Sequence, residues 1–212
     1  MAEAVFLSAG VPDPKRGPEY ARTADAVAIQ AAVSALLYVT LGRRKLIWGG
    51  QPAITPIIWV VAADLGVDYG EWVHLYQSRH FEQDFPEENA RFQNVTFSDD
   101  VGGDRDKSLL LMRERMFSEN EFSSAVFIGG MKGIIDEFSM FSNAQPCAEV
   151  VPVASTGGAT LDVAKLSGRS EADLWLNLDY VSLFHKMLHI SVKEKRYPRM
   201  KDQPEKIEQR LQ

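Results

Sequence analysis

The chain is almost devoid of cysteine, because Cys147 is its one thiol among 212 residues. A single cysteine excludes an internal disulfide and fits a reducing compartment. The first residues show no basic leader before an apolar stretch, and no uncharged apolar run reaches the about 18 residues of a membrane span. We therefore expect a cytoplasmic protein with no membrane partner.

Positive charge and metal ligands are also scarce. The chain has 23 Lys and Arg against 29 Asp and Glu, a net charge of −6. Broad nucleic-acid binding requires a basic face and is not expected, although a local basic pocket for a phosphorylated ligand is compatible with this charge. His185 and His189 have the spacing of a metal pair, but no glutamate follows His185 and no third ligand is evident. We expect no metal and no cofactor.

Short apolar runs alternate with helical segments along most of the chain. This alternation predicts an α/β fold, a single doubly wound Rossmann-like and mostly parallel sheet with helices on both faces. The expected strands are 5–7, 45–48, 73–76, 94–97, 124–128 and 149–154, and the expected helices are 22–41, 55–65, 107–117, 134–142, 159–166 and 171–190.

Two of these helices carry start signals. Thr23 is the expected cap of helix 22–41. Thr55 is expected at the N-cap of helix 55–65, with Pro56 at its first position. Because helix 55–65 is apolar nearly all round, we expect it to be buried. Residues 80–93 have no clear periodicity and are expected to form an irregular surface segment.

Two glycine pairs directly follow apolar runs. Residues 45–48 lead into Gly49 and Gly50, and residues 125–128 lead into Gly129 and Gly130. Glycine allows the backbone to approach an anion, and a following helix presents free N–H groups and the positive end of its dipole. The repeated pattern predicts a nucleotide-like ligand held between two loops.

Polar or glycine-rich segments follow most of the expected strands. Because ligands of parallel sheets bind at the carboxyl ends of the strands, these segments form the expected ligand-binding rim. Its candidate residues are Ser8, Gly10, Gly49, Gly50, Gln51, Gln77, Arg79, Gly129, Gly130, Met131, Gly133, Ser155 and Thr156.

The end of the chain has a different composition. Residues 192–212 contain seven Lys or Arg, four Asp or Glu and two prolines, with almost nothing apolar. We expect residues 1–191 to form the domain and residues 192–212 a charged tail, either solvated or acting as a docking arm, with the solvated form favoured.

The second glycine loop carries a family resemblance. Residues 128–137 read IGGMKGIIDE, and the preceding helix contains Arg113 and Arg115. Together with the first loop, these residues resemble the SLOG superfamily, Rossmann-like domains named for the SMF/DNA-processing and Lonely Guy proteins. Over roughly residues 4–190 the chain is similar to the prokaryotic SLOG group related to the ligand-sensing domain of TRP-melastatin channels. The resemblance implies a homodimer.

The chain departs from the Lonely Guy motif of proline, Gly-Gly-x-Gly-Thr-x-x-Glu. Ile128 replaces the proline, the loop has one extra residue, and Gly133-Ile134 replaces Gly-Thr. In the hydrolase branch, the resemblance assigns catalytic roles to the motif glutamate and the helix arginine. The matching residues are Glu137 or Asp136, and Arg113 or Arg115. Because these arginines are two apart on a helix, they point to different faces, and at most one faces the loop.

The resemblance and the broken motif together favour recognition over chemistry. We expect the protein to bind a nucleotide or nucleotide-derived signal, such as an ADP-ribose-like molecule, as a sensor. The alternative is a nucleoside-5′-monophosphate phosphoribohydrolase-like N-glycosidase that uses Glu137 and Arg113. A third hypothesis is a partner-binding module with a vestigial pocket.

Overall fold

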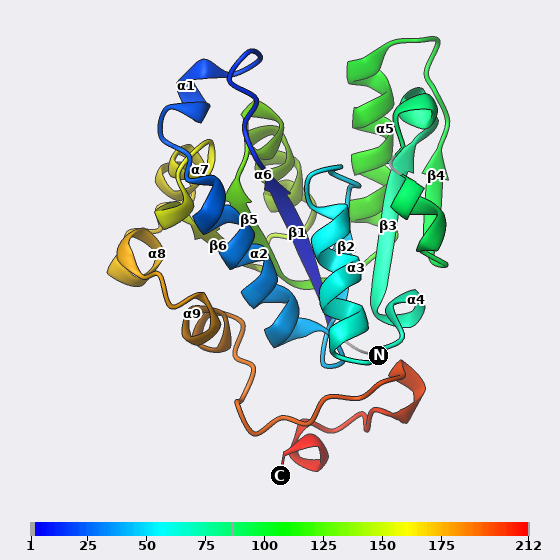
Figure 1. The fold of residues 1–212 in the computed structure, drawn as a ribbon, viewed down its shortest axis with the longest axis vertical. Helices are drawn as coiled ribbons and strands as arrows, with labels where there is room; N and C mark the ends of the chain where they lie inside the picture. Colours follow the sequence, from blue (N-terminus) through cyan, green and yellow to red (C-terminus); the bar gives the residue numbers. More distant parts are fainter. Residues whose placement is uncertain (1–2, 86, 212) are drawn as a thin grey trace.

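A six-stranded parallel sheet forms the centre of the molecule (Figure 1). The computed structural model describes residues 3–85 and 87–211. The strands lie in the order β4-β3-β2-β1-β5-β6. Their bounds are β1 Ala4–Gly10, β2 Lys45–Trp48, β3 Val73–Ser78, β4 Val95–Ser98, β5 Phe122–Gly129 and β6 Glu149–Val153. The predicted doubly wound α/β fold is confirmed.

Helices cover both faces of the sheet (Figure 1). One layer contains α2 (Ala26–Thr40), α3 (Thr55–Asp64), α8 (Ala172–Leu176) and α9 (Tyr180–Met187), and the other contains α5 (Arg105–Ser118), α6 (Lys132–Ala144) and α7 (Thr160–Leu166). The short elements are α1 (Pro18–Ala21), α4 (Tyr69–Trp72) and the 3-10 turns Arg79–Asp84, Glu87–Arg91, Ala154–Thr156, Met200–Asp202 and Ile207–Arg210. No helix in the described ranges is long and apolar enough to cross a membrane.

The alternation of side chains along β1 assigns its residues to the two layers. Val5 and Leu7 pack in the core shared with α2 and α3. Phe6 packs in the opposite core, where its ring lies 5.0 Å from that of Phe117 and 5.6 Å from that of Phe141. Ser8 continues the row of Phe6, so the same alternation directs its hydroxyl towards α6.

Two predicted helix caps are wrong. Asp25, not Thr23, caps α2, because its carboxylate accepts from the N–H groups of Val27 and Ala28. Helix α3 begins one residue early, at Thr55, with Ile54 at the N-cap and no side-chain cap. The Thr55 hydroxyl instead donates to the Gln51 carbonyl at 3.2 Å.

Two further expectations about helices are corrected. The predicted helix 171–190 is divided into α8 and α9, because Asp179 caps a new helix by accepting from the N–H of Ser182. Helix α3 is buried on one face only, and Val60 is 56% exposed. Residues 80–93, predicted to be irregular, include two short 3-10 turns.

The C-terminal segment is packed against the domain, contrary to the favoured solvated tail. It crosses the molecule at the edge of the sheet where the strands begin (Figure 1, orange to red). Glu194 is 2% exposed and forms ion pairs with Arg44 at 2.6 Å and Arg210 at 3.6 Å. Arg196 and Arg43 also donate to carbonyls in the last turn of α2, which have no partners within the helix. Charge therefore holds this segment in place.

Replacing Glu194 with glutamine tests this packing. Glu194→Gln leaves two buried guanidinium groups without their shared carboxylate, a change that costs about 3 kcal/mol. We expect a matching decrease in the free energy of unfolding in urea titrations. Glu208→Gln, at an exposed position of the same segment, is the control and should change stability by less than about 0.5 kcal/mol. Equal stability of the two variants would contradict the analysis.

A half-buried histidine on β3 gives the fold a pH dependence. The His74 Nε2 lies 2.8 Å from the Thr96 hydroxyl, and its Nδ1 is buried without a partner among the described residues. Burial, with a smaller contribution from Lys45, lowers the pKa of His74 from 6.5 to about 4. As the pH falls, the unfolded chain therefore binds this proton before the folded protein does.

We expect stability to fall between about pH 6.5 and pH 4 for this reason, with no further contribution from His74 below pH 4. Removing the imidazole in His74→Gln should make the decrease in melting temperature from pH 7 to pH 5 smaller than in the wild type. Thermal denaturation by circular dichroism at both pH values measures this difference. An unchanged decrease would show that His74 does not titrate as described.

Candidate functional site

A cavity of about 550 Å³ opens at the edge of the sheet where the strands end. The segments that follow β1, β2, β3 and β5 contribute to its walls, together with α5 and α6. Strands β1 and β5 are neighbours, and the order of strands reverses between them. Ligands of open α/β sheets bind at such a topological switch point. The volume lies within the range of about 300–1,000 Å³ typical of small-molecule sites.

Three loops converge at this cavity. The N–H of Gly130 donates to the Gly10 carbonyl at 2.6 Å, which joins the end of β1 to the loop after β5. A Cβ atom on Gly10 would lie 3.5 Å from the Gln51 side-chain nitrogen, so the loop after β2 also lies against the end of β1. Gly50 and Gly130 have φ values of +76° and +69°, which glycine adopts without strain. These glycines permit the close approach.

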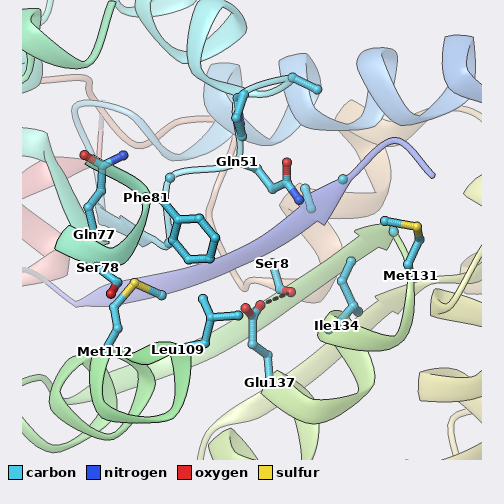
Figure 2. Close-up of a pocket in the computed structure, with 18 of the residues that line it drawn as sticks. Ser8, Gln51, Gln77, Ser78, Phe81, Leu109, Met112, Met131, Ile134 and Glu137 are labelled. Atoms are coloured by element: carbon cyan, nitrogen blue, oxygen red, sulfur yellow. Dashed lines mark hydrogen bonds between the residues drawn. The ribbon is translucent and has the colours of Figure 1, made fainter. Parts of the chain in front are cut away.

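Glu137 of α6 forms hydrogen bonds with residues of β1 and α5. The Ser8 hydroxyl donates to its Oε2 at 2.5 Å (Figure 2). Arg113 of α5 donates to its Oε1 from Nε at 3.1 Å and from a terminal nitrogen at 3.0 Å. The Arg113 and Glu137 side chains are 11% and 17% exposed, and all three residues line the cavity.

This geometry distinguishes the alternative residues that the sequence leaves open. Arg115 is directed away, because it pairs with Glu119 at 2.6 Å and donates to the Phe97 carbonyl. Asp136 is exposed and is not among the described residues that line the cavity. Arg113 and Glu137 are therefore the members of each pair at the cavity.

The cavity brings together nine of the expected rim residues. These are Ser8, Gly10, Gly49, Gly50, Gln51, Gln77, Gly130, Met131 and Gly133. Among the described residues, the other four rim candidates, Arg79, Gly129, Ser155 and Thr156, do not line it. Arg79 and Gly129 adjoin the lining residues Ser78 and Gly130 in the chain, and Thr156 contacts Gly129.

The side chains of three of these residues contact other parts of the fold. The buried Thr156 hydroxyl accepts from the N–H of Gly129 at 3.0 Å and donates to the Val153 carbonyl at 2.7 Å. Ser155 donates to the Tyr180 hydroxyl at 3.4 Å. Arg79 pairs with Glu82 and lies 4.9 Å from the centre of the Phe97 ring.

Sequence reasoning missed two arginines and two aromatic residues of the cavity. Arg16 and Arg105 line it, as do Phe81 and Phe85. Phe81 and Phe85 lie in the segment that was expected to be irregular, shortly after β3 ends. Their position shortly after a strand, at the edge of the sheet where the other rim residues lie, could have indicated from the sequence that they line the cavity.

Charge around the cavity is more positive than the chain as a whole. Its lining includes Arg16, Arg105 and Arg113 against Asp84 and Glu137, so cations exceed anions by one in a chain of net charge −6. The Arg16 guanidinium forms no ion pair with any residue in the described ranges. Helix α6 begins at the cavity without a side-chain cap and without an acidic residue in its first turn. These features favour an anionic ligand.

A metal centre receives no support from the described part of the chain. No group of three or more His, Cys, Asp or Glu side chains there is arranged to hold a metal ion. The His185 Nδ1 lies 2.7 Å from the Ile190 carbonyl, so this ring is part of the turn that ends α9.

Comparisons with known proteins identify the family. No curated protein matches the chain. The crystal structure of TM1055, a target of the Northeast Structural Genomics Consortium, is similar with a TM-score of 0.50 and 14% identity, over 88% of this chain and 99% of that one. This likeness supports the fold alone. The model of the SLOG cluster3 family matches residues 19–188. The chain therefore belongs to the SLOG cluster3 family, which confirms the SLOG resemblance of its glycine loops.

Proposed function

We propose that the protein binds a nucleotide or nucleotide-derived molecule, such as an ADP-ribose-like signal, in the cavity at the strand ends. The observation that carries this proposal is the convergence of two glycine loops and the uncapped start of α6 on one cavity of about 550 Å³. Membership of the SLOG cluster3 family supports it.

The side of the cavity near Met131 suits the phosphates. Met131 and Gly133 line it at the start of α6, where main-chain N–H groups and the helix dipole favour an anion. The exposed Arg16 is close by, because a Cβ atom on the adjacent Gly17 would lie 3.0 Å from the Met131 sulfur. Its guanidinium can bind phosphate oxygens in a bidentate manner.

Two observations favour recognition without chemistry. Both carboxylate oxygens of Glu137 already accept hydrogen bonds, from Ser8 and from Arg113. These three hydrogen bonds occupy most of the about four lone-pair sites of the carboxylate, so the contacts with Ser8 and Arg113 give Glu137 a structural role that needs no chemistry. The extra residue in the second loop also replaces the Gly-Thr of the hydrolase motif with Gly133 and Ile134.

The alternative function is hydrolysis of an N-glycosidic bond, favoured by the inward position of Glu137. Water would attack the anomeric carbon of the ribose while the bond to the base breaks. The leaving base would take the bonding electron pair and a proton from solvent, and the attacking water would lose a proton to Glu137, which returns it to solvent. Arg113 would position the carboxylate.

A ligand panel tests the binding proposal. ADP-ribose, its cyclic isomers, AMP and cyclic nucleotides should be compared by thermal shift. A ligand at 100 times its Kd stabilises the folded state by about 2.7 kcal/mol, which corresponds to an increase of roughly 5–10 °C in a chain of this size. Arg16→Ala should weaken binding of a phosphorylated ligand about tenfold, since it removes the unpaired cation. Arg22→Ala, an exposed arginine outside the cavity lining, is the control. The absence of any shift would overturn the proposal.

Glu137→Gln separates binding from hydrolysis. The amide cannot accept the proton of water, so the variant should release no base even if the wild type does. Its thermal shift with the ligand should persist. Asp136→Asn is the same chemical change at the exposed neighbouring residue and should behave as the wild type. Chromatographic detection of free base measures the outcome. No base release by the wild type removes the enzyme alternative, and if ligand binding is also absent, the partner-binding module is the hypothesis that stands.

A further inference from the structure

Gln77 occupies a position where the pattern of its strand calls for an apolar residue. Val73 and Leu75 of β3 pack in the core shared with α2 and α3. Gln77 is the next residue in that row, because alternate residues of a strand face the same side. It is 4% exposed and lines the cavity at the end of β3 (Figure 2).

The amide of Gln77 has unused hydrogen-bonding capacity. Its Oε1 is buried and has no hydrogen-bond partner among the residues that the structure describes. A buried polar atom without a partner destabilises the folded state, so such atoms are rare and their positions require an explanation. Since Gln77 lines a cavity, rotation of its side chain can bring the oxygen to the cavity surface, where a bound ligand can supply the missing donor.

Gly50 leaves space beside the amide, and the cavity wall adds an aromatic surface. A Cβ atom on Gly50 would lie 2.8 Å from the Gln77 side-chain nitrogen, so the absence of a side chain at Gly50 makes room for the amide. Phe81 and Phe85 line the same cavity. Aromatic rings stack on the faces of nucleobases and bind them with little preference among bases. Discrimination between one base and another must then come from a polar side chain that hydrogen-bonds to the edge of the base.

We propose that Gln77 determines base specificity by reading the amino edge of an aminopurine. A glutamine amide can accept from an exocyclic amino group through its oxygen and donate to an adjacent ring nitrogen through its NH₂ group, as it does with adenine. On the edge that carries N7, a 6-oxopurine offers two acceptors, O6 and N7, and therefore leaves the Gln77 oxygen without a donor. This inference rests on the proposed binding of a nucleotide-derived ligand.

Paired ligands that differ only in the base test the inference. Isothermal titration calorimetry should compare ADP-ribose with its hypoxanthine analogue, and AMP with IMP. We expect the wild type to favour the adenine member of each pair by about 5- to 150-fold, the range of a good bidentate contact. Gln77→Met, which keeps the length of the side chain, should abolish this preference. Ribose 5-phosphate, which lacks the base, should bind both proteins equally.

The ligand-free variant provides a second readout. Because Gln77→Met removes a buried polar atom without a partner, it should raise the melting temperature of the ligand-free protein. Gln209→Met is the same change at an exposed position of the C-terminal segment and should alter neither stability nor binding. A lower melting temperature with unchanged base preference would show that the amide serves the fold.

The outcomes distinguish the two proposals. If the wild type binds none of these ligands, the proposed function fails. If the wild type binds them without preferring adenine, or if the preference survives in Gln77→Met, the inference about Gln77 is overturned while the proposed function stands.

Discussion

The site depends on the contact between two main-chain segments, Gly10 at the end of β1 and Gly130 directly after β5, joined by an N–H···O bond of 2.6 Å. Gly129 and Gly130 both have positive φ values, and a Cβ atom on Gly130 would collide with Ile134. Side chains at these positions would force the strand ends apart. The glycines therefore allow the two segments to come into contact. Because α6 begins two residues after Gly130, this contact also positions the start of α6 and the Glu137 side chain at the cavity.

Much of the fold and the centre of the site could be predicted from the sequence. Alternating apolar runs define a parallel sheet, and its geometry brings the segments after Leu7, Trp48 and Ile128 to one edge. The sequence was less informative where two neighbouring residues are both suited to the same structural role. Thr23 and Asp25 are both good helix caps, and only the packed structure shows that Asp25 binds the free N–H groups of α2.

The choice between adjacent residues also required the structure. A helix turns by about 100° per residue, so the sequence alone could not determine which of Arg113 and Arg115 faces Glu137. Arg16 was missed for a different reason, because the path of a proline-rich loop leaves no periodic pattern. The charged residues after position 192 were read as solvated, yet the sequence could not reveal that Glu194 meets Arg44 across 150 positions.

The buried pairing of Arg44 with Glu194 has a consequence for protein synthesis. Arg44 emerges from the ribosome long before Glu194, and domains generally begin to fold while their later residues are still being made. Until residue 194 appears, the exposed carboxylate of Glu3 is the partner available to Arg44, at 2.8 Å in the finished structure. Before then, Arg44 and Glu3 form a partly exposed ion pair at the edge where the strands begin. Glu194 and Arg210 then add a second carboxylate and a second guanidinium, which bury the Arg44 side chain and cover that edge.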